Sequence, residues 1–341
     1  MKYEFPKIDL HLHLDGSFRT STMLRLAAER GVSLPGGTEE EYDAFNMKCS
    51  NANDVNNFLE MFKYPLLVMQ DKESISLITY ELIEDLYAQG LAYAEIRFAP
   101  QLHTNKGLTQ DDAVEAVLEG RARAAADFPG IKTGIITCMM SIGPETLNWN
   151  ENAETVEVCR RFIGKGVVAL DLAGGEGFVP LSNFAPLFRK ASEYGIPVIC
   201  HAGDSQDWRT VKDAIDFGAV RIGHGHHIYE NPELCRIAAE KSVALEICPT
   251  SNIQCKTRET YAMHPASNLL RMGVPVTINT DNMNLSRVTL DDEYDHCLNE
   301  MGFEEADLVR MNINSLEASF LSQEEKEPLR RRLLGYLDGD C

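Results

Sequence analysis

Four polar clusters in the sequence follow apolar segments and carry side chains that could hold a metal ion or move a proton. They are His11-Leu12-His13-Leu14-Asp15-Gly16, His201-Ala202-Gly203-Asp204, His224-Gly225-His226-His227 and Thr280-Asp281-Asn282. Alternate residues of an extended strand face the same side, so the imidazoles of His11 and His13 can reach one ion. Because each cluster ends an apolar segment, we expect the four to meet at one end of a sheet.

The candidate metal ligands are three imidazoles, from His11, His13 and His201, and the carboxylate of Asp281. This set suits zinc and leaves a coordination position for water, although iron, nickel or manganese could be held by the same donors. A bound ion of this kind lowers the pKa of its water from about 15.7 to about 7. We therefore expect one Zn²⁺ per subunit and a hydrolytic reaction.

Attack of water on a ring also requires a base that takes the proton of the water and an acid that protonates the ring. We interpret His224 as the base and Asp204 as the acid. The neighbouring His226 and His227 fit a turn or a surface position better than a ligand position.

The elements that must position these residues are short apolar segments, typical of strands, that alternate with helical patterns. Eight such segments are present: Lys7–His13, Ala92–Phe98, Lys132–Cys138, Val167–Leu172, Pro197–His201, Val220–His224, Val243–Cys248 and Val274–Asp281. Helix-forming stretches such as 111–127 and 232–241 lie between most of them. The regular order, with no Gly-x-Gly-x-x-Gly after the first strand, favours a (β/α)8 TIM barrel over an open doubly wound sheet.

Residues 35–89 do not fit a single strand–helix unit, because they contain several helical patterns where the barrel needs one. We expect a helical insertion after the first strand, placed where it could act as a lid over the barrel mouth. Further helices follow Asp281 and end in the charged stretch 323–337. No linker marks a second domain, so we expect one α/β domain over residues 1–341.

The charge balance limits the class of partner. The 341 residues include 32 Lys and Arg against 52 Asp and Glu, a net charge of −20. Such a surface repels phosphate backbones and anionic lipid, so we expect neither a nucleic-acid nor a membrane partner. The charges leave the oligomeric state open.

Location is indicated by the N-terminus and the cysteines. Residues 1–14 include several charged side chains and no apolar core of signal-peptide length, and no apolar run is long enough to span a bilayer. The nine cysteines are scattered, and Cys138, Cys200 and Cys248 lie in apolar segments with no metal-ligand spacing. Buried thiols of this kind indicate a reducing compartment, and we expect a cytoplasmic protein.

Several motifs, taken in order, resemble those of the adenosine deaminase family of metal-dependent amidohydrolase barrels. They are Lys7-Ile-Asp-Leu-His-Leu-His-Leu-Asp-Gly16, Asp171-Leu-Ala-Gly174, His201-Ala-Gly203, Arg221-Ile-Gly-His-Gly225, Ile247-Cys-Pro-Thr-Ser-Asn252 and Ile278-Asn-Thr-Asp281. The resemblance covers most of the chain. It implies conversion of adenosine and 2′-deoxyadenosine to inosine and 2′-deoxyinosine with release of ammonia, a step of purine salvage.

The resemblance also implies roles for individual residues. Zinc would be bound by His11, His13, His201 and Asp281, the set already proposed from the residues alone. His224 would orient and deprotonate the water. Asp15 would meet the ribose 5′-hydroxyl, the backbone of Gly174 would face the purine N3, and the residue after Asp281 would bind N7.

Three positions depart from the family pattern. Asp204 stands where the family has a glutamate as proton donor, and its side chain is one methylene shorter. Asn282 replaces an aspartate, but its amide has an NH2 group that can donate to N7. Gly175 occupies a position where an acidic residue is common, which affects recognition near N3 and the sugar.

Two alternatives to adenosine deamination stay open at this point. One is a deaminase of another aminopurine, such as adenine or an N6-methylated or 5′-modified adenosine. The other is a catalytically weak relative that binds nucleosides as a sensor or growth factor. A nucleic-acid deaminase is disfavoured, since that class carries Pro-Cys-x-x-Cys and here Cys248 precedes Pro249.

Overall fold

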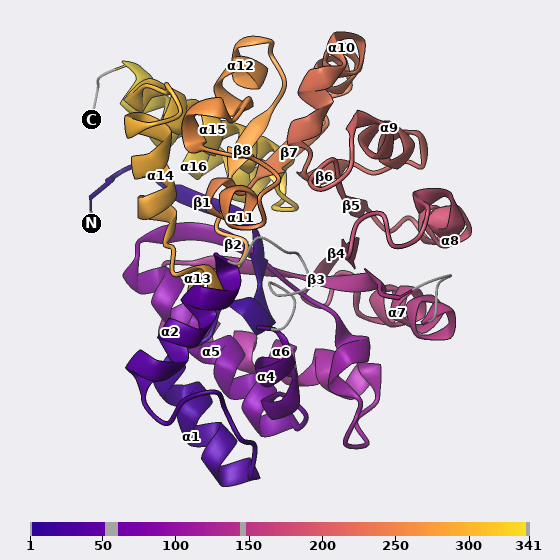
Figure 1. The fold of residues 1–341 in the computed structure, drawn as a ribbon. Helices are drawn as coiled ribbons and strands as arrows, with labels where there is room; N and C mark the ends of the chain where they lie inside the picture. The colour runs from indigo at the N-terminus through magenta and orange to yellow at the C-terminus, as the bar shows by residue number, and fades with distance from the viewer. Residues whose placement is uncertain (1, 52–60, 144–147, 339–341) are drawn as a thin grey trace.

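The computed structural model describes residues 2–51, 61–143 and 148–338, and its centre is a sheet of eight parallel strands (Figure 1). The strands are paired in chain order, each with the next. They are β1 (Lys7–His13), β2 (Leu91–Phe98), β3 (Lys132–Ser141), β4 (Val167–Gly174), β5 (Val198–Ala202), β6 (Arg221–His224), β7 (Ala244–Ile247) and β8 (Val276–Ile278). All eight predicted strands are confirmed.

The first and last strands meet and nearly close the barrel. Leu12 and Asp281 form a parallel bridge, in which the N–H of Asp281 donates to the carbonyl of His11 and the N–H of His13 donates to the carbonyl of Asp281. The predicted eighth strand, 274–281, is longer than β8. Asn279 and Thr280 lie between β8 and the bridge at Asp281, and the carboxylate of Asp9 accepts both the backbone N–H and the hydroxyl of Thr280.

Helices lie outside the strands and cover the barrel (Figure 1). Their starts follow local capping rules: Thr109 and Asp112 form a reciprocal capping box, and Asn231 caps a helix whose first residue is Pro232. The helices between β2 and β8 are α6 (Gln110–Asp127), α7 (Trp149–Phe162), α8 (Ala185–Glu193), α9 (Trp208–Asp216), α10 (Pro232–Glu240), α11 (Pro249–Gln254) and α12 (Ala266–Arg271). This arrangement confirms the (β/α)8 TIM barrel.

Extra helices are present at the two places where the sequence predicts them. Between β1 and β2 lie α1 (Thr20–Arg30), α2 (Glu39–Ser50), α4 (Lys63–Val68) and α5 (Lys72–Ala88). Of these, α5 packs against β2 and α6 as a barrel helix does. After β8 come α13 (Met283–Ser286), α14 (Leu290–Asn299), α15 (Glu305–Ala318) and α16 (Gln323–Asp338). Residues 52–60 of the expected insertion lie outside the described residues, and its function as a lid stays a prediction.

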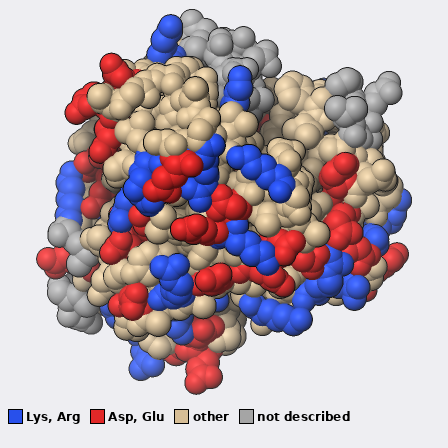
Figure 2. Space-filling model, turned by 90° about the horizontal axis from the view of Figure 1, so that it is seen from below, with Lys and Arg blue, Asp and Glu red and all other residues tan. Residues whose placement is uncertain are grey.

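Acidic and basic side chains are interspersed on the face drawn in Figure 2. Of the described helices, none combines the length and the apolar content that a bilayer crossing requires. Six of the described cysteines are buried free thiols, including Cys200 and Cys248, as predicted for core residues.

Candidate metal and active site

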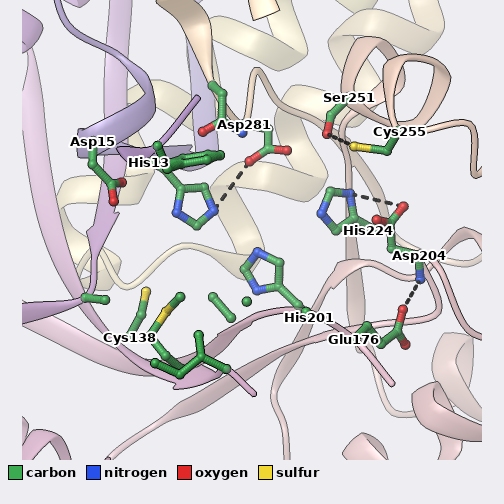
Figure 3. Close-up of a pocket in the computed structure, with 18 of the residues that line it drawn as sticks. His13, Asp15, Cys138, Glu176, His201, Asp204, His224, Ser251, Cys255 and Asp281 are labelled. Atoms are coloured by element: carbon green, nitrogen blue, oxygen red, sulfur yellow. Dashed lines mark hydrogen bonds and ion pairs between the residues drawn. The ribbon is translucent and has the colours of Figure 1, made fainter. Parts of the chain in front are cut away.

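A cavity of about 320 Å³ opens at the carboxyl ends of the strands, and most of the predicted site residues line it (Figure 3). Those in its lining are His13, Asp15, Gly174, His201, Asp204, His224, Asp281 and Asn282. The remaining predicted ligand, His11, is fully buried beside them. The structure therefore brings together residues from β1, β4, β5, β6 and the turn after β8.

The four predicted metal ligands converge at this end of the barrel. The Nε2 atoms of His11 and His13 lie 3.5 Å and 3.4 Å from Oδ1 of Asp281. The ring centroid of His201 is 4.6 Å from that of His11 and 5.5 Å from that of His13. Burial lowers the pKa of His11 and His13, so both rings are neutral at pH 7, as metal ligands must be.

Two buried carboxylates contact Nδ1 of His11 and Nδ1 of His201, the ring nitrogens opposite those proposed to bind the ion. Oε2 of Glu246 lies 2.9 Å from Nδ1 of His11, and Oδ2 of Asp171 lies 3.1 Å from Nδ1 of His201. Metal-ligating histidines usually donate their second N–H to such a carboxylate, which aims the other nitrogen at the ion. Nε2 of His11 is buried without a hydrogen bond among the described residues. These residues fit a resident divalent ion of the zinc type.

Distances alone would also allow two other ligand groups, His224 with His11 and His201, or Cys248 with His11 and Asp281. We prefer the predicted set for chemical reasons. Nδ1 of His224 contacts an amide group of Asn252 rather than a carboxylate, unlike Nδ1 of His11 and His201. Burial raises the pKa of the Cys248 thiol, which disfavours the thiolate that binds metals.

A buried arginine joins the two carboxylates behind the ligands. Arg97 donates to Asp171 at 2.9 Å and to Glu246 at 2.7 Å, and none of the three side chains is exposed. Burial raises the pKa of both carboxyls, but their partners outweigh it: His201 and Arg97 lower the pKa of Asp171, and the guanidiniums of Arg97 and Arg221 lower that of Glu246. Both acids are therefore held as carboxylates.

The backbone is strained at two of the site residues. His224 has φ of 61° and Asp281 has φ of 60°, left-handed values that residues other than glycine rarely adopt. His224 ends β6 and Asp281 lies three residues after β8, and both side chains line the cavity at the barrel mouth. Strain of this kind persists where the surrounding structure enforces it, and it is common at functional sites.

Asp204 is held by a cluster that sequence reasoning missed. Its Oδ1 accepts hydrogen bonds from Nδ2 of Asn252 at 2.7 Å, from the Thr257 hydroxyl at 2.9 Å and from Nε2 of His226 at 3.1 Å. Oδ2 makes no hydrogen bond to the described residues. Burial raises the pKa of Asp204, but nearby His224 and these hydrogen bonds outweigh it and hold the pKa below the usual range.

His226 lies in the short helix η5 (His226–Glu230), so the predicted turn is confirmed. His226 is fully buried in this turn, where Asp204 and Arg258 satisfy both of its nitrogens. His227, by contrast, is partly exposed and contacts Glu230.

The loop that carries Asp204 is fixed by Glu176, a second residue that the sequence analysis did not identify. The carboxylate of Glu176 accepts the backbone N–H groups of Gly203, Asp204, Ser205 and Gln206 at 2.6 to 3.0 Å. Its only signal in the sequence is its position, two residues after the Asp171-Leu-Ala-Gly174 motif.

Asp15, Gly174 and Asn282, the three predicted substrate-binding residues, line the same cavity. Oδ1 of Asp15 and Oδ1 of Asn282 are buried without a hydrogen bond among the described residues. Burial raises the pKa of Asp15 to about 6. Gly174 has φ of 97°, and a Cβ there would lie 2.6 Å from the carbonyl oxygen of Ser141, so only glycine fits.

Comparison with known proteins places this arrangement in a family. The sequence profile described as Adenosine deaminase matches residues 6–336, nearly the whole chain. The chain belongs to the adenosine deaminase family. It is 38% identical over 329 residues to an adenosine deaminase of Haemophilus ducreyi, covering 96% of this chain and 95% of that protein.

Two solved structures extend the comparison of this adenosine deaminase family member. Adenine deaminase from Arthrobacter aurescens aligns with a TM-score of 0.87 and 25% identity, covering 98% of this chain and 100% of that one. A cog1816 amidohydrolase from Burkhoderia ambifaria, with bound Zn, aligns with a TM-score of 0.88 and 25% identity, covering 98% and 91%. The chain is thus a hydrolytic deaminase with a site suited to a metal ion.

Proposed function

We propose that this family member uses Zn²⁺ to convert adenosine and 2′-deoxyadenosine to inosine and 2′-deoxyinosine, with release of ammonia. The observation that carries the proposal is the pair of buried carboxylates, Glu246 and Asp171, that hold Nδ1 of His11 and His201 beside the carboxylate of Asp281. The adenosine deaminase of Haemophilus ducreyi and the zinc-containing amidohydrolase support the substrate and the metal.

His11, His13, His201 and Asp281 would hold the ion. When bound, zinc acts as a Lewis acid that makes water a nucleophile at neutral pH. The chain's own residues then have to place the purine ring and move protons. Overall, one water is consumed, and the 6-amino group leaves as ammonia.

His224 and Asp204 are the pair proposed to handle protons. They lie side by side, with Oδ1 of Asp204 3.9 Å from Nδ1 of His224 (Figure 3). His224 orients the attacking water. Asp204, whose Oδ2 has no hydrogen bond to the described residues, exchanges a proton with N1 of the ring as C6 is attacked.

Asp15, Gly174 and Asn282 are proposed to place the substrate. Asp15 accepts the ribose 5′-hydroxyl, Asn282 donates its amide N–H to N7, and the backbone of Gly174 faces N3. A hydrogen bond from a ligand hydroxyl would satisfy the buried Oδ1 of Asp15, whose desolvation is otherwise uncompensated.

The charges of the cavity favour a nucleoside over a nucleotide. Its described lining contains the acidic residues Asp15, Glu176, Asp204 and Asp281 but no lysine or arginine. A 5′-phosphate near Asp15 would meet a like charge without a cationic partner. Adenine alone would leave Asp15 without a donor, which argues against the activity named for the Arthrobacter aurescens neighbour.

The products suggest purine salvage as the setting. A cytoplasmic location agrees with the buried free thiols, which persist in reducing compartments. The partner is proposed to be the small nucleoside itself, with no nucleic acid or membrane involved.

The test is a substrate comparison with the metal-loaded protein. Loss of ultraviolet absorbance and release of ammonia are followed for adenosine, 2′-deoxyadenosine, adenine, AMP and N6-methyladenosine. We expect the two nucleosides to have the highest kcat/KM. A higher kcat/KM for adenine, AMP or N6-methyladenosine would replace the proposal with that activity, and binding without turnover would indicate a nucleoside-binding relative.

A further inference from the structure

Asn252 lies between the two residues proposed to handle protons, and neither the family motifs nor the proposed mechanism gives it a role. It is fully buried in α11. Its Nδ2 lies 2.7 Å from Oδ1 of Asp204 and 3.1 Å from Nδ1 of His224. One amide group therefore contacts both partners.

The orientation of the Asn252 amide follows from the backbone N–H of Ala266, a group that can only donate. The backbone N–H of Ala266 donates to Nδ1 of His264, so Nδ1 carries no hydrogen. Burial lowers the pKa of His264 well below its usual value, so the ring is neutral with its hydrogen on Nε2. That Nε2 lies 3.2 Å from Oδ1 of Asn252 and donates to it. The NH2 group of Asn252 must then face Asp204 and His224.

The side chain of Arg258, which can only donate, leads to the same orientation of the Asn252 amide. Nε of Arg258 donates to Nδ1 of His226 at 2.9 Å, which leaves the hydrogen of His226 on Nε2. His226 therefore donates to Oδ1 of Asp204, as does the Thr257 hydroxyl. Oδ1 of Asp204 is an acceptor on all sides, which again requires the NH2 group of Asn252 to face it.

We propose that Asn252 is a positioning residue that keeps the ring hydrogen of His224 on Nε2. An NH2 group can only donate to Nδ1, so Nδ1 carries no hydrogen. Figure 3 shows the opposite edge of the His224 ring facing His13, His201 and Asp281. His224 thus presents a donor, rather than an acceptor, to the centre of the site.

The consequence for the reaction rests on the proposed function. His224 donates a hydrogen bond through Nε2 and orients the attacking water, but it cannot take a proton on that atom. The proton of the water passes instead to the carboxylate of Asp204, and from there to N1 of the purine. The proton transfer that the resemblance assigns to His224 is thus assigned to Asp204.

The position of the hydrogen can be read by long-range ¹H–¹⁵N correlation spectroscopy of the ¹⁵N-labelled, Zn²⁺-loaded protein. The chain has nine histidines, and His224→Gln identifies the signals of His224 by their loss. We expect a protonated Nε2 and an unprotonated Nδ1 in the wild type. A protonated Nδ1 would overturn the proposal.

Two substitutions test the dependence on Asn252. Asn252→Asp replaces the donor with an acceptor, and we expect the hydrogen of His224 to move to Nδ1. If two adjacent carboxylates prevent folding, Asn252→Ala removes the donor without adding charge. We then expect a mixture of both tautomers and a kcat lowered by about 100-fold, with a smaller change in KM. A folded Asn252→Ala protein with the wild-type tautomer would overturn the proposal.

Thr257→Val is the matched control. It removes another donor to the same oxygen of Asp204 but leaves the contact of Asn252 with His224. We expect its His224 tautomer to be that of the wild type, and a shifted tautomer would assign the effect to Asp204 instead. The spectrum is independent of turnover. Nδ1 protonation in a protein that deaminates adenosine refutes this inference alone, whereas Nε2 protonation without turnover refutes the proposed function alone.

Discussion

Oε2 of Glu246 lies 2.9 Å from Nδ1 of His11, and neither side chain is exposed to solvent. Glu246 stands on β7 and His11 on β1, so the contact crosses the interior of the barrel. It aims Nε2 of His11 at the predicted metal position. The same carboxylate also accepts hydrogen bonds from Arg97 and Arg221.

Glu246→Gln should therefore weaken zinc binding by about 10- to 100-fold, because the amide is a poorer partner for Nδ1 of His11. Competition with a chromophoric chelator measures this on protein shown to be folded by circular dichroism. The matched control is Glu95→Gln, which removes another buried partner of Arg221 without touching His11. Equal losses of zinc affinity in the two variants would contradict the assigned role.

Asp204→Asn should lower kcat by about 100-fold or more, because the amide cannot take and return a proton. Its shape is nearly unchanged, so KM should change little. Steady-state kinetics with adenosine measures both constants. A variant with the wild-type kcat would remove Asp204 from proton transfer.

7-Deazaadenosine should be a much poorer substrate than adenosine, because it lacks the N7 acceptor proposed for Asn282. The loss of one hydrogen bond that leaves a buried partner unsatisfied costs about 1–3 kcal/mol. The ratio of the two kcat/KM values measures this directly. A ratio near one would place Asn282 away from N7.

Gly16→Ala should disturb the proposed contact between Asn282 and N7 by changing the protein rather than the substrate. A Cβ at Gly16 would lie 1.9 Å from Oδ1 of Asn282, so the amide must move. We expect a raised KM for adenosine and a smaller difference between adenosine and 7-deazaadenosine. Gly37→Ala is the control, because a Cβ there meets only Oε2 of Glu41 at 3.7 Å. Wild-type discrimination in Gly16→Ala would show that Asn282 does not determine it.

Asp15 should make the ligand-free protein less stable as the pH rises through about 6, the value to which burial raises its pKa. The folded pKa is above the unfolded value, so its contribution is most favourable at low pH and is lost as the carboxyl ionises. The loss is up to about 3 kcal/mol. Unfolding of the wild type and Asp15→Asn should diverge as the pH rises from about 4 to about 6 and run parallel above that. Curves that stay parallel over the whole range from pH 4 to 8 would contradict the raised pKa.

The sequence predicts the strands and the convergence of the four proposed ligands well, because both depend on local patterns. The polar clusters stand at the ends of the apolar segments. His11 and His13 are separated by a single residue, which puts both on one side of β1. The end of β8 was harder to predict, because the N–H of Thr280 donates to the carboxylate of Asp9, which is distant in the sequence.

The residues around Asp204 could not be predicted in the same way. His226, Asn252 and Thr257 come from segments that follow two different strands, β6 and β7. Nothing near them in the sequence indicates that they share one oxygen of Asp204. Arg97 looks like an ordinary strand residue until its partners from β4 and β7 are known. Such contacts depend on the closed barrel rather than on local pattern.

The central claim, a metal-dependent adenosine deaminase, is tested most directly by titrating Zn²⁺ into chelator-treated protein while following ammonia release from adenosine. We expect activity to rise in proportion to bound zinc and to saturate at one ion per chain, with neither zinc nor activity in Asp281→Ala. Full turnover of adenosine by zinc-free wild type or by zinc-free Asp281→Ala would contradict the account.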